Sequence, residues 1–264
     1  MDVSRISATT FPLVDRSLDD ALGVLEAAGF KNVDLMEKMP HMSLDPDECD
    51  LDEVAACAKA HGIGIANLAT YVGDALQSED EQEQEASYQD VIRAIDAAEK
   101  LGARSIRGFR SPKFDAPEGV PRMVPWAKKC AEYAAGKGIY MGLENHGGGI
   151  SGVPEVCRDL AAQVGSPYFG VLYDPCNLIT RGTDYKEGLE VMKDHVVHVH
   201  IKDGTNEERS QEKTMLGDGD VDVPWILQRL EEIGYDGYIT LEYECKSEPP
   251  DTGLKKWFDT LAAM

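Results

Sequence analysis

The chain has 264 residues, of which 42% are hydrophobic and 28% are charged. That composition is typical of a globular protein, and the length is sufficient for one large α/β domain. Acidic residues outnumber basic residues by 48 to 26, so the formal net charge is −22. Because nucleic-acid binding relies on Lys and Arg that neutralise phosphates, this charge disfavours DNA or RNA as a partner.

The chain carries no signal for a membrane or for export. No apolar run approaches the roughly 18 residues of a membrane span. The first residues, MDVSR, lack the charged-then-apolar pattern of a secretory signal. The six cysteines form no Cys-x-x-Cys pair, which argues against a zinc ribbon and against a disulfide framework. We therefore expect a cytoplasmic protein that has no membrane partner.

Short β-rich runs alternate with longer helical patterns along the chain. The expected strands cover residues 5–10, 32–37, 64–70, 104–109, 139–146, 169–174, 196–203 and 238–243. The expected helices cover residues 18–28, 51–61, 81–101, 125–138, 154–164, 184–194, 224–233 and 253–262. Eight strand-then-helix units without a linker predict a single α/β domain over residues 1–264, a (β/α)8 TIM barrel. A doubly wound sheet is the competing fold, but the first strand is not followed by a glycine-rich phosphate loop.

Proline and glycine mark several helix ends. Proline is expected to open three helices, where its missing N–H costs nothing: Pro125, Pro154 and Pro224. Glycine is expected to end four helices in the left-handed conformation: Gly29, Gly62, Gly102 and Gly234.

The candidate chemistry lies at the ends of the last four strands, because TIM-barrel active sites form at the C-terminal ends of the strands. The metal-competent groups found there are Glu144, Asp174, His200 and Glu242. Three carboxylates close together would repel one another, and a divalent cation is the simplest way to keep all three ionised. Three oxygen ligands and one imidazole suit Mn²⁺, Mg²⁺ or Co²⁺, with Zn²⁺ possible. Taken singly, a carboxylate at a strand end is more often a helix cap or a salt-bridge partner than a metal ligand.

Four segments resemble the xylose isomerase-like TIM-barrel superfamily. They are Glu144-Asn145-His146, Asp174-Pro175-Cys176-Asn177, the run from His198 to Asp203, and Leu241-Glu242-Tyr243-Glu244. The superfamily contains sugar-phosphate isomerases and epimerases, ketose 3-epimerases, hydroxypyruvate isomerases, inosose dehydratases and C-glycoside deglycosidase catalytic subunits. The resemblance implies that Glu144, Asp174, His200 and Glu242 bind a divalent metal, with Mn²⁺ the first choice. It also implies that Glu144 and Glu242 exchange the proton on a carbon next to a carbonyl.

The expected activity is therefore that of a sugar or sugar-phosphate isomerase or epimerase, which works through a metal-stabilised enediolate. A metal-dependent lyase or dehydratase is the alternative, acting on keto-sugars or inososes and including 3-keto-C-glycoside cleavage. His146 favours this alternative because it follows Glu144 on the same side of the strand and is suited to acid/base catalysis. Its structural alternative is a group that binds a hydroxyl or supports the metal ligands. A non-catalytic sugar-binding subunit is a remote third hypothesis.

Five further residues are candidates for contact with a small sugar substrate: Lys202, Asn177, Arg107, Glu37 and Arg209. Lys202 has a structural alternative, an ion pair with Asp203 or with an acid opposite. Arg107 is suited to hold a phosphate or carboxylate, with a salt bridge as its alternative. Arg209 lies in the long connection after the seventh strand, and loops of that length are often functional lids. The resemblance also allows a homo-oligomer.

Overall fold

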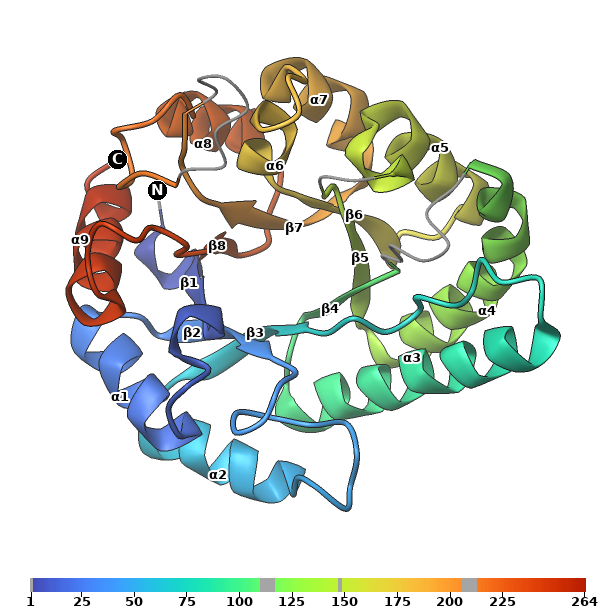
Figure 1. Ribbon diagram of the computed structural model, residues 1–264, viewed down its shortest axis with the longest axis horizontal. Helices are drawn as coiled ribbons and strands as arrows, with labels where there is room; N and C mark the ends of the chain where they lie inside the picture. The colour runs from blue at the N-terminus through green and yellow to red at the C-terminus, as the bar shows by residue number, and fades with distance from the viewer. Residues whose placement is uncertain (1, 110–116, 147–148, 206–212) are drawn as a thin grey trace.

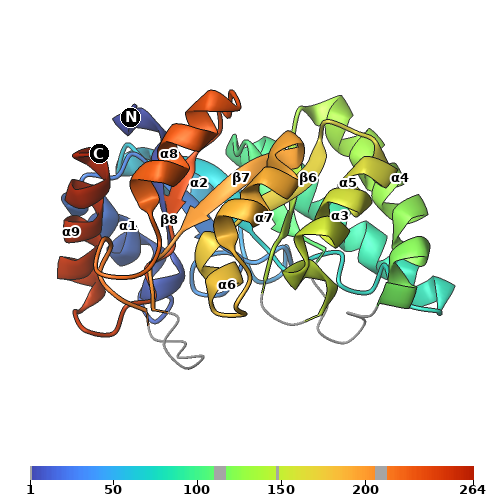
Figure 2. The same ribbon diagram turned by 90° about the horizontal axis from the view of Figure 1, so that it is seen from above.

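A closed barrel of parallel strands forms the centre of the molecule (Figure 1). The structure, a computed structural model, describes residues 2–109, 117–146, 149–205 and 213–264. Within those residues eight strands follow one another around the barrel in chain order, and helices surround them (Figure 2). The predicted (β/α)8 TIM barrel is confirmed.

Each strand falls within a predicted one. The strands are β1 (Ile6–Thr9), β2 (Asn32–Met36), β3 (Gly64–Ala69), β4 (Ser105–Gly108), β5 (Tyr140–Glu144), β6 (Phe169–Tyr173), β7 (Val196–Ile201) and β8 (Ile239–Leu241). The barrel closes where β8 pairs with β1, with Ser7 opposite Thr240. Nearly every strand residue is buried, because side chains fill the barrel on one face and the helices cover the other.

The helices form the outer layer. They are α1 (Leu18–Ala28), α2 (Leu51–Ala60), α3 (Glu81–Leu101), α4 (Val120–Lys137), α5 (Pro154–Val164), α6 (Pro175–Ile179), α7 (Tyr185–Met192), α8 (Val223–Glu232) and α9 (Pro250–Ala262). The last helix lies beside the first and completes the ring (Figure 1), with the Phe30 and Phe258 rings edge to face at 5.0 Å. Trp257 and Leu254 of α9 are fully buried against the barrel.

Two helix starts differ from the prediction by more than one residue, and one short α-helix was not predicted. Pro125 lies inside α4, so the prediction that it opens the helix is wrong. Pro121 occupies the first turn instead, and Pro125 interrupts one hydrogen bond of the second turn. The last helix starts at Pro250 rather than at residue 253. The short α6 follows Asp174, which caps it, and its five residues are too few for a periodic pattern.

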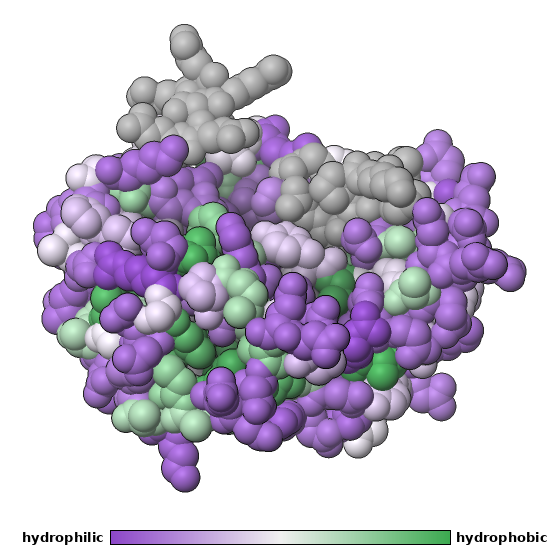
Figure 3. All heavy atoms as spheres, turned by 60° about the horizontal axis from the view of Figure 1, so that its bottom comes forward, coloured by the Kyte–Doolittle hydropathy of each residue, from purple (hydrophilic) through white to green (hydrophobic). Residues whose placement is uncertain are grey.

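The polar surface agrees with the composition. Hydrophilic residues predominate on the face shown in Figure 3. Among the described residues, none of the helices has the length and apolar character that crossing a membrane requires.

The four glycines expected at helix ends all have positive φ, from 62° at Gly62 to 108° at Gly29. Gly102, at φ 72°, ends α3, and a Cβ there would meet no atom within 4 Å. Only the backbone conformation therefore opposes a side chain at this position.

Replacing Gly102 should therefore destabilise the protein through backbone strain alone. We expect Gly102→Ala to lower the free energy of unfolding by roughly 1–2 kcal/mol, measured by urea denaturation. Gly136 is the matched control, because it lies exposed inside α4 and a Cβ there also meets nothing within 4 Å. Gly136→Ala should raise the free energy of unfolding by roughly 0.5–1 kcal/mol. Effects of the same sign in both variants would contradict this interpretation.

Candidate metal centre

Four side chains from four neighbouring strands converge at the C-terminal mouth of the barrel. Glu144 ends β5, Asp174 follows β6, His200 lies in β7 and Glu242 follows β8. One possible ligand atom of each lies within 4.8 Å of those of the other three. All four residues are buried, with Glu242 the most exposed at 6%. The structure thus brings together the residues that the strand ends predicted.

Among the described residues, two buried polar atoms of this group find no hydrogen-bond partner. The Nδ1 atom of His200 has no hydrogen-bond partner and lies 3.9 Å from Glu144 Oε1 and 3.8 Å from Glu242 Oε2. Asp174 Oδ2 makes no hydrogen bond either, although it pairs with the Lys202 ammonium at 3.0 Å. Buried polar atoms normally have hydrogen-bond partners, so a buried nitrogen and a buried oxygen without one, in the same cluster, call for an explanation. The donor set of three carboxylates and an imidazole fits a divalent cation.

Asp34, which the sequence analysis missed, orients His200 from below. It is fully buried in β2, and its Oδ2 atom accepts hydrogen bonds from His200 Nε2 at 3.0 Å and His198 Nε2 at 2.7 Å. Ser7 and Thr240 donate to its other oxygen. Histidine ligands usually donate the second ring N–H to a carboxylate, which leaves the first nitrogen available to a metal. His198 therefore belongs to the buried hydrogen-bond network around Asp34.

The position of Asp174 is held by its neighbours along the chain. Its Oδ1 atom accepts from the backbone N–H of Asn177 at 3.0 Å, so the side chain caps α6. The side chain of Asn145 bonds both the backbone N–H and the carbonyl of Asp174, at 2.8 and 2.7 Å. Asn145 therefore ties the end of β5 to the end of β6, a role that sequence reasoning did not assign. The helix-cap alternative and the metal-ligand prediction for Asp174 are compatible, since each uses a different oxygen.

Burial and mutual repulsion shape the charge of the site. Burial raises the pKa of Asp174 to about 7, with Lys202 opposing the rise and the other two carboxylates adding to it. Burial acts the same way on Glu242, but Lys202 and His200 outweigh it and hold the pKa of that carboxyl well below its usual range. Burial lowers the pKa of His200, yet Asp34 and Glu242 together raise it to about 10. For all three carboxylates to stay ionised in this buried site, positive charge must lie beside them, from the protonated His200 and Lys202 side chains or from a bound cation.

Lys202 pairs with acids across the mouth. Its ammonium contacts Glu242, lies 3.2 Å from Glu244 Oε1 and is buried. The expected alternative of an ion pair with an acid opposite is therefore realised, whereas Asp203 is not its partner. The Asp203 carboxylate instead accepts backbone N–H groups that shape the following loop, those of Gly204, Gly217, Gly219 and Val221.

Arg107 and Asn177 both hold Glu144. The Nη1 atom of Arg107 lies 3.3 Å from Glu144 Oε2, and the side-chain amide of Asn177 donates to Oε1 at 3.1 Å. The guanidinium also stacks on Tyr71 at 4.5 Å. Its Nη2 atom is buried and makes no hydrogen bond to the described residues. The salt-bridge alternative for Arg107 is therefore present, with one N–H pair left over for another acceptor.

A cavity of about 160 Å³ opens beside the four converging side chains. Its walls comprise Thr9, Phe11, Met36, Ala69, Tyr71, Arg107, Glu144, His146, Glu242 and Glu244. Glu37 lies outside it, in a larger cavity of about 590 Å³ that shares Tyr71 as a wall. Arg209 falls outside the described residues. Of the predicted substrate contacts, Arg107 thus lines the smaller cavity together with His146.

Removing the carboxylate of Asp34 should weaken metal binding without touching a ligand. We expect Asp34→Asn to lower the affinity for Mn²⁺ by about 10–100-fold, because an amide has one acceptor oxygen and no charge where both oxygens of Asp34 accept hydrogen bonds, one of them from His200. Isothermal titration calorimetry on metal-stripped protein measures this. Ser7→Ala is the matched control, since it removes one hydrogen bond to Asp34 and leaves the contact with His200. Unchanged affinity in Asp34→Asn would show that the contact does not orient a ligand.

Two relatives match the sequence over different lengths. Over 119 residues the chain is 32% identical to an uncharacterized protein of Methanocaldococcus jannaschii, a match that covers 43% of this chain and 40% of that protein. It is 23% identical to an inosose dehydratase of Clostridium perfringens over 260 residues, covering 87% of this chain and 83% of the relative.

The fold is shared with solved sugar epimerases. An L-ribulose 3-epimerase superposes with a TM-score of 0.82 at 18% identity, covering 98% of this chain and 93% of the other. The sequence model described as xylose isomerase-like TIM barrel matches residues 22–264. The chain therefore belongs to the xylose isomerase-like TIM-barrel family.

Proposed function

We propose that this protein is a divalent-metal-dependent isomerase or epimerase of a sugar or sugar phosphate. The observation that carries the proposal is the convergence of four buried metal-competent groups within 4.8 Å, one of them an imidazole whose Nδ1 atom has no hydrogen-bond partner among the described residues. Glu144, Asp174, His200 and Glu242 would hold the cation. Their three oxygens and one nitrogen suit Mn²⁺, while Mg²⁺, Co²⁺ and Zn²⁺ are also compatible.

The proposed reaction begins with removal of the proton next to a carbonyl. The cation would polarise the carbonyl and an adjacent hydroxyl, which lowers the cost of an enediolate. Glu144 and Glu242 line the cavity from the ends of β5 and β8, so one carboxylate can take the proton and the other, in its carboxylic acid form, can donate its own proton to carbon. Return from the opposite side inverts the carbon, and return to the neighbouring carbon isomerises the sugar.

The residues around these two carboxylates fix their positions. Arg107 and Asn177 each bond one oxygen of Glu144, and the ammonium of Lys202 contacts Glu242. A base held by fixed donors reaches its proton without rearrangement, which is the usual source of efficient proton transfer. The second N–H pair of Arg107 is available to a substrate oxygen or phosphate. We assign substrate binding first to Arg107, which lines the cavity, while substrate contact by Asn177, Lys202, Glu37 and Arg209 stays a prediction.

Elimination is a second candidate outcome of the same first step. It is favoured by the similarity to an inosose dehydratase along 83% of that protein and by the position of His146 on the cavity wall. A protonated imidazole there would donate its proton to a departing hydroxyl, so that the C–O bond breaks and water leaves. In either case the partner is a small sugar or keto-sugar, and we expect the enzyme to work in the cytoplasm.

Loss of either glutamate should stop proton exchange while the fold persists. Proton NMR in D₂O, over a panel of free ketoses, ketose phosphates, inososes and 3-keto-glycosides, measures deuterium uptake beside the carbonyl. With Mn²⁺ we expect uptake on at least one substrate, and none after treatment with EDTA. Glu144→Gln and Glu242→Gln should slow uptake by roughly 10²–10⁴-fold, because an amide cannot accept the proton. Their melting temperatures should stay near that of the wild type.

Glu244→Gln is the matched control for that experiment. Glu244 lines the same cavity and contacts Lys202, but it is not one of the four converging groups. We expect it to retain most of the wild-type rate. Near-normal exchange in Glu144→Gln or Glu242→Gln, or no exchange on any substrate, would contradict the proposed mechanism.

His146 should separate the two outcomes. If elimination is the reaction, His146→Ala should slow the loss of water from the substrate by roughly 10²-fold or more. Deuterium uptake beside the carbonyl should stay within about tenfold of the wild-type rate. The same NMR spectra report both rates, as unsaturated product and as exchanged substrate. A change confined to KM would instead assign His146 to substrate binding.

A further inference from the structure

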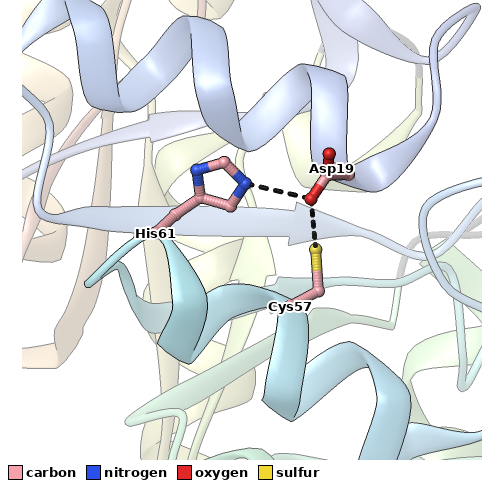
Figure 4. Close-up of side chains that lie close together, drawn as sticks. All are labelled: Asp19, Cys57 and His61. Atoms are coloured by element: carbon pink, nitrogen blue, oxygen red, sulfur yellow. Dashed lines mark hydrogen bonds and ion pairs between the residues drawn. The ribbon is translucent and has the colours of Figure 1, made fainter.

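A second group of metal-ligating side chains lies outside the barrel, between α1 and α2 (Figure 4). Asp19 comes from the first turn of α1. Cys57 belongs to the last turn of α2, and His61 is the residue that ends this helix. Residues four apart lie one above the other on a helix, so the thiol and the imidazole face the same neighbouring helix.

The distances among the three groups are close to those of a metal site. Asp19 Oδ1 lies 3.2 Å from His61 Nε2 and 3.9 Å from Cys57 Sγ, and all three ligand atoms fall within 4.8 Å of one another. Bond lengths to tetrahedral zinc imply separations of roughly 3.3–3.6 Å between such ligand atoms. Figure 4 shows the ring and the sulfur both directed toward the carboxylate.

A fourth residue orients the imidazole. Glu26 Oε2 lies 2.9 Å from His61 Nδ1, the arrangement in which a carboxylate fixes the tautomer of a histidine ligand. With the proton on Nδ1, the lone pair of Nε2 faces a carboxylate oxygen, and such a contact requires a positive charge. Without a metal, an imidazolium between the two carboxylates and a Cys57 thiol that donates to Asp19 Oδ1 satisfy these contacts. A zinc ion would replace the two protons that point at Asp19, the one on His61 Nε2 and the one on Cys57 Sγ.

The exposure of the group permits entry of an ion. The side chain of Asp19 is 77% exposed and that of His61 is 17% exposed, so an ion held by the imidazole and thiol can keep water as a further ligand. One thiolate, one imidazole and one carboxylate form a softer donor set than the oxygen-rich metal centre in the barrel.

We propose that Asp19, Cys57 and His61 bind a zinc ion, with Glu26 orienting the histidine. The site is separate from the metal centre in the barrel and takes a different class of metal, since thiolate ligands favour Zn²⁺ over Mn²⁺. A bound ion would link α1 to α2, and its free energy of binding would add to the stability of the fold.

Sulfur ligation makes the test specific to this site. The full-length protein is stripped of metal, kept reduced with a phosphine and titrated with Co²⁺ as a spectroscopic substitute for Zn²⁺. The expected result is a sulfur-to-cobalt charge-transfer absorption that is complete by two equivalents, because the barrel centre can also take Co²⁺ but its four groups include no sulfur. Cys57→Ser should abolish that absorption. His61→Ala and Asp19→Asn should each weaken Zn²⁺ binding at least about tenfold by calorimetry.

Two variants serve as controls. Cys49 is the other half-buried cysteine, so Cys49→Ser should keep the absorption. Glu144→Gln alters the barrel centre and should also keep it, which separates this proposal from the proposed catalytic function. Because Asp19 is exposed, Asp19→Asn should fold normally even if a change at the half-buried Cys57 does not. No charge-transfer absorption in the wild type, or the same absorption in Cys57→Ser, would overturn the proposal.

Discussion

The balance of charge in the mouth of the barrel is the constraint on which the rest of the site depends. Three carboxylates offer oxygens within 4.8 Å of one another in a buried place. At an effective dielectric constant of about 20, two like charges about 4 Å apart repel by roughly 4 kcal/mol, a large part of the net stability of a typical domain. The surrounding basic side chains offset that repulsion. Lys202 lies 3.0 Å from Asp174, Arg107 lies 3.3 Å from Glu144, and His200 Nδ1 lies 3.9 Å from Glu144. A divalent cation would place positive charge at the point where the carboxylates meet. His200 could then be neutral and offer Nδ1 as a ligand.

The orientation of the site is a property of the barrel below it. Asp34 accepts hydrogen bonds from side chains on β1, β3, β7 and β8, so one carboxylate joins strands that are far apart in the chain. Because β8 pairs with β1 to close the barrel, the partners of Asp34 come together only when the barrel is complete. Closure of the sheet therefore fixes the orientation of the His200 ring, and with it the direction in which Nδ1 points. The proposed metal site thus depends on a complete barrel.

Sequence reasoning succeeded where a local rule governs the structure. The alternation of strand and helix patterns predicted the barrel, and the two-residue period of strands predicted that Glu144, Asp174, His200 and Glu242 converge. The same period argues against an ion pair of Lys202 with Asp203, since adjacent strand residues face opposite sides. Asp34 was missed because its partners are non-local: an acid inside an apolar strand signals a buried network, but not which strands supply the donors. The start of α4 was misplaced because two prolines compete for one helix opening, and only tertiary packing decides between Pro121 and Pro125.

Within the proposed mechanism, the four converging groups determine the first step and the cavity wall determines the second. Abstraction of a proton beside a carbonyl is common to epimerisation and elimination, so the ligand set is the same for both and carries no information about the outcome. The outcome depends on which group faces the resulting enediolate: a carboxylate such as Glu242 returns a proton to carbon, whereas an imidazole such as His146 gives one to a departing oxygen. Both line the same cavity of about 160 Å³. The substrate is therefore the deciding partner, because the carbon or the hydroxyl that it places beside His146 selects the bond that changes.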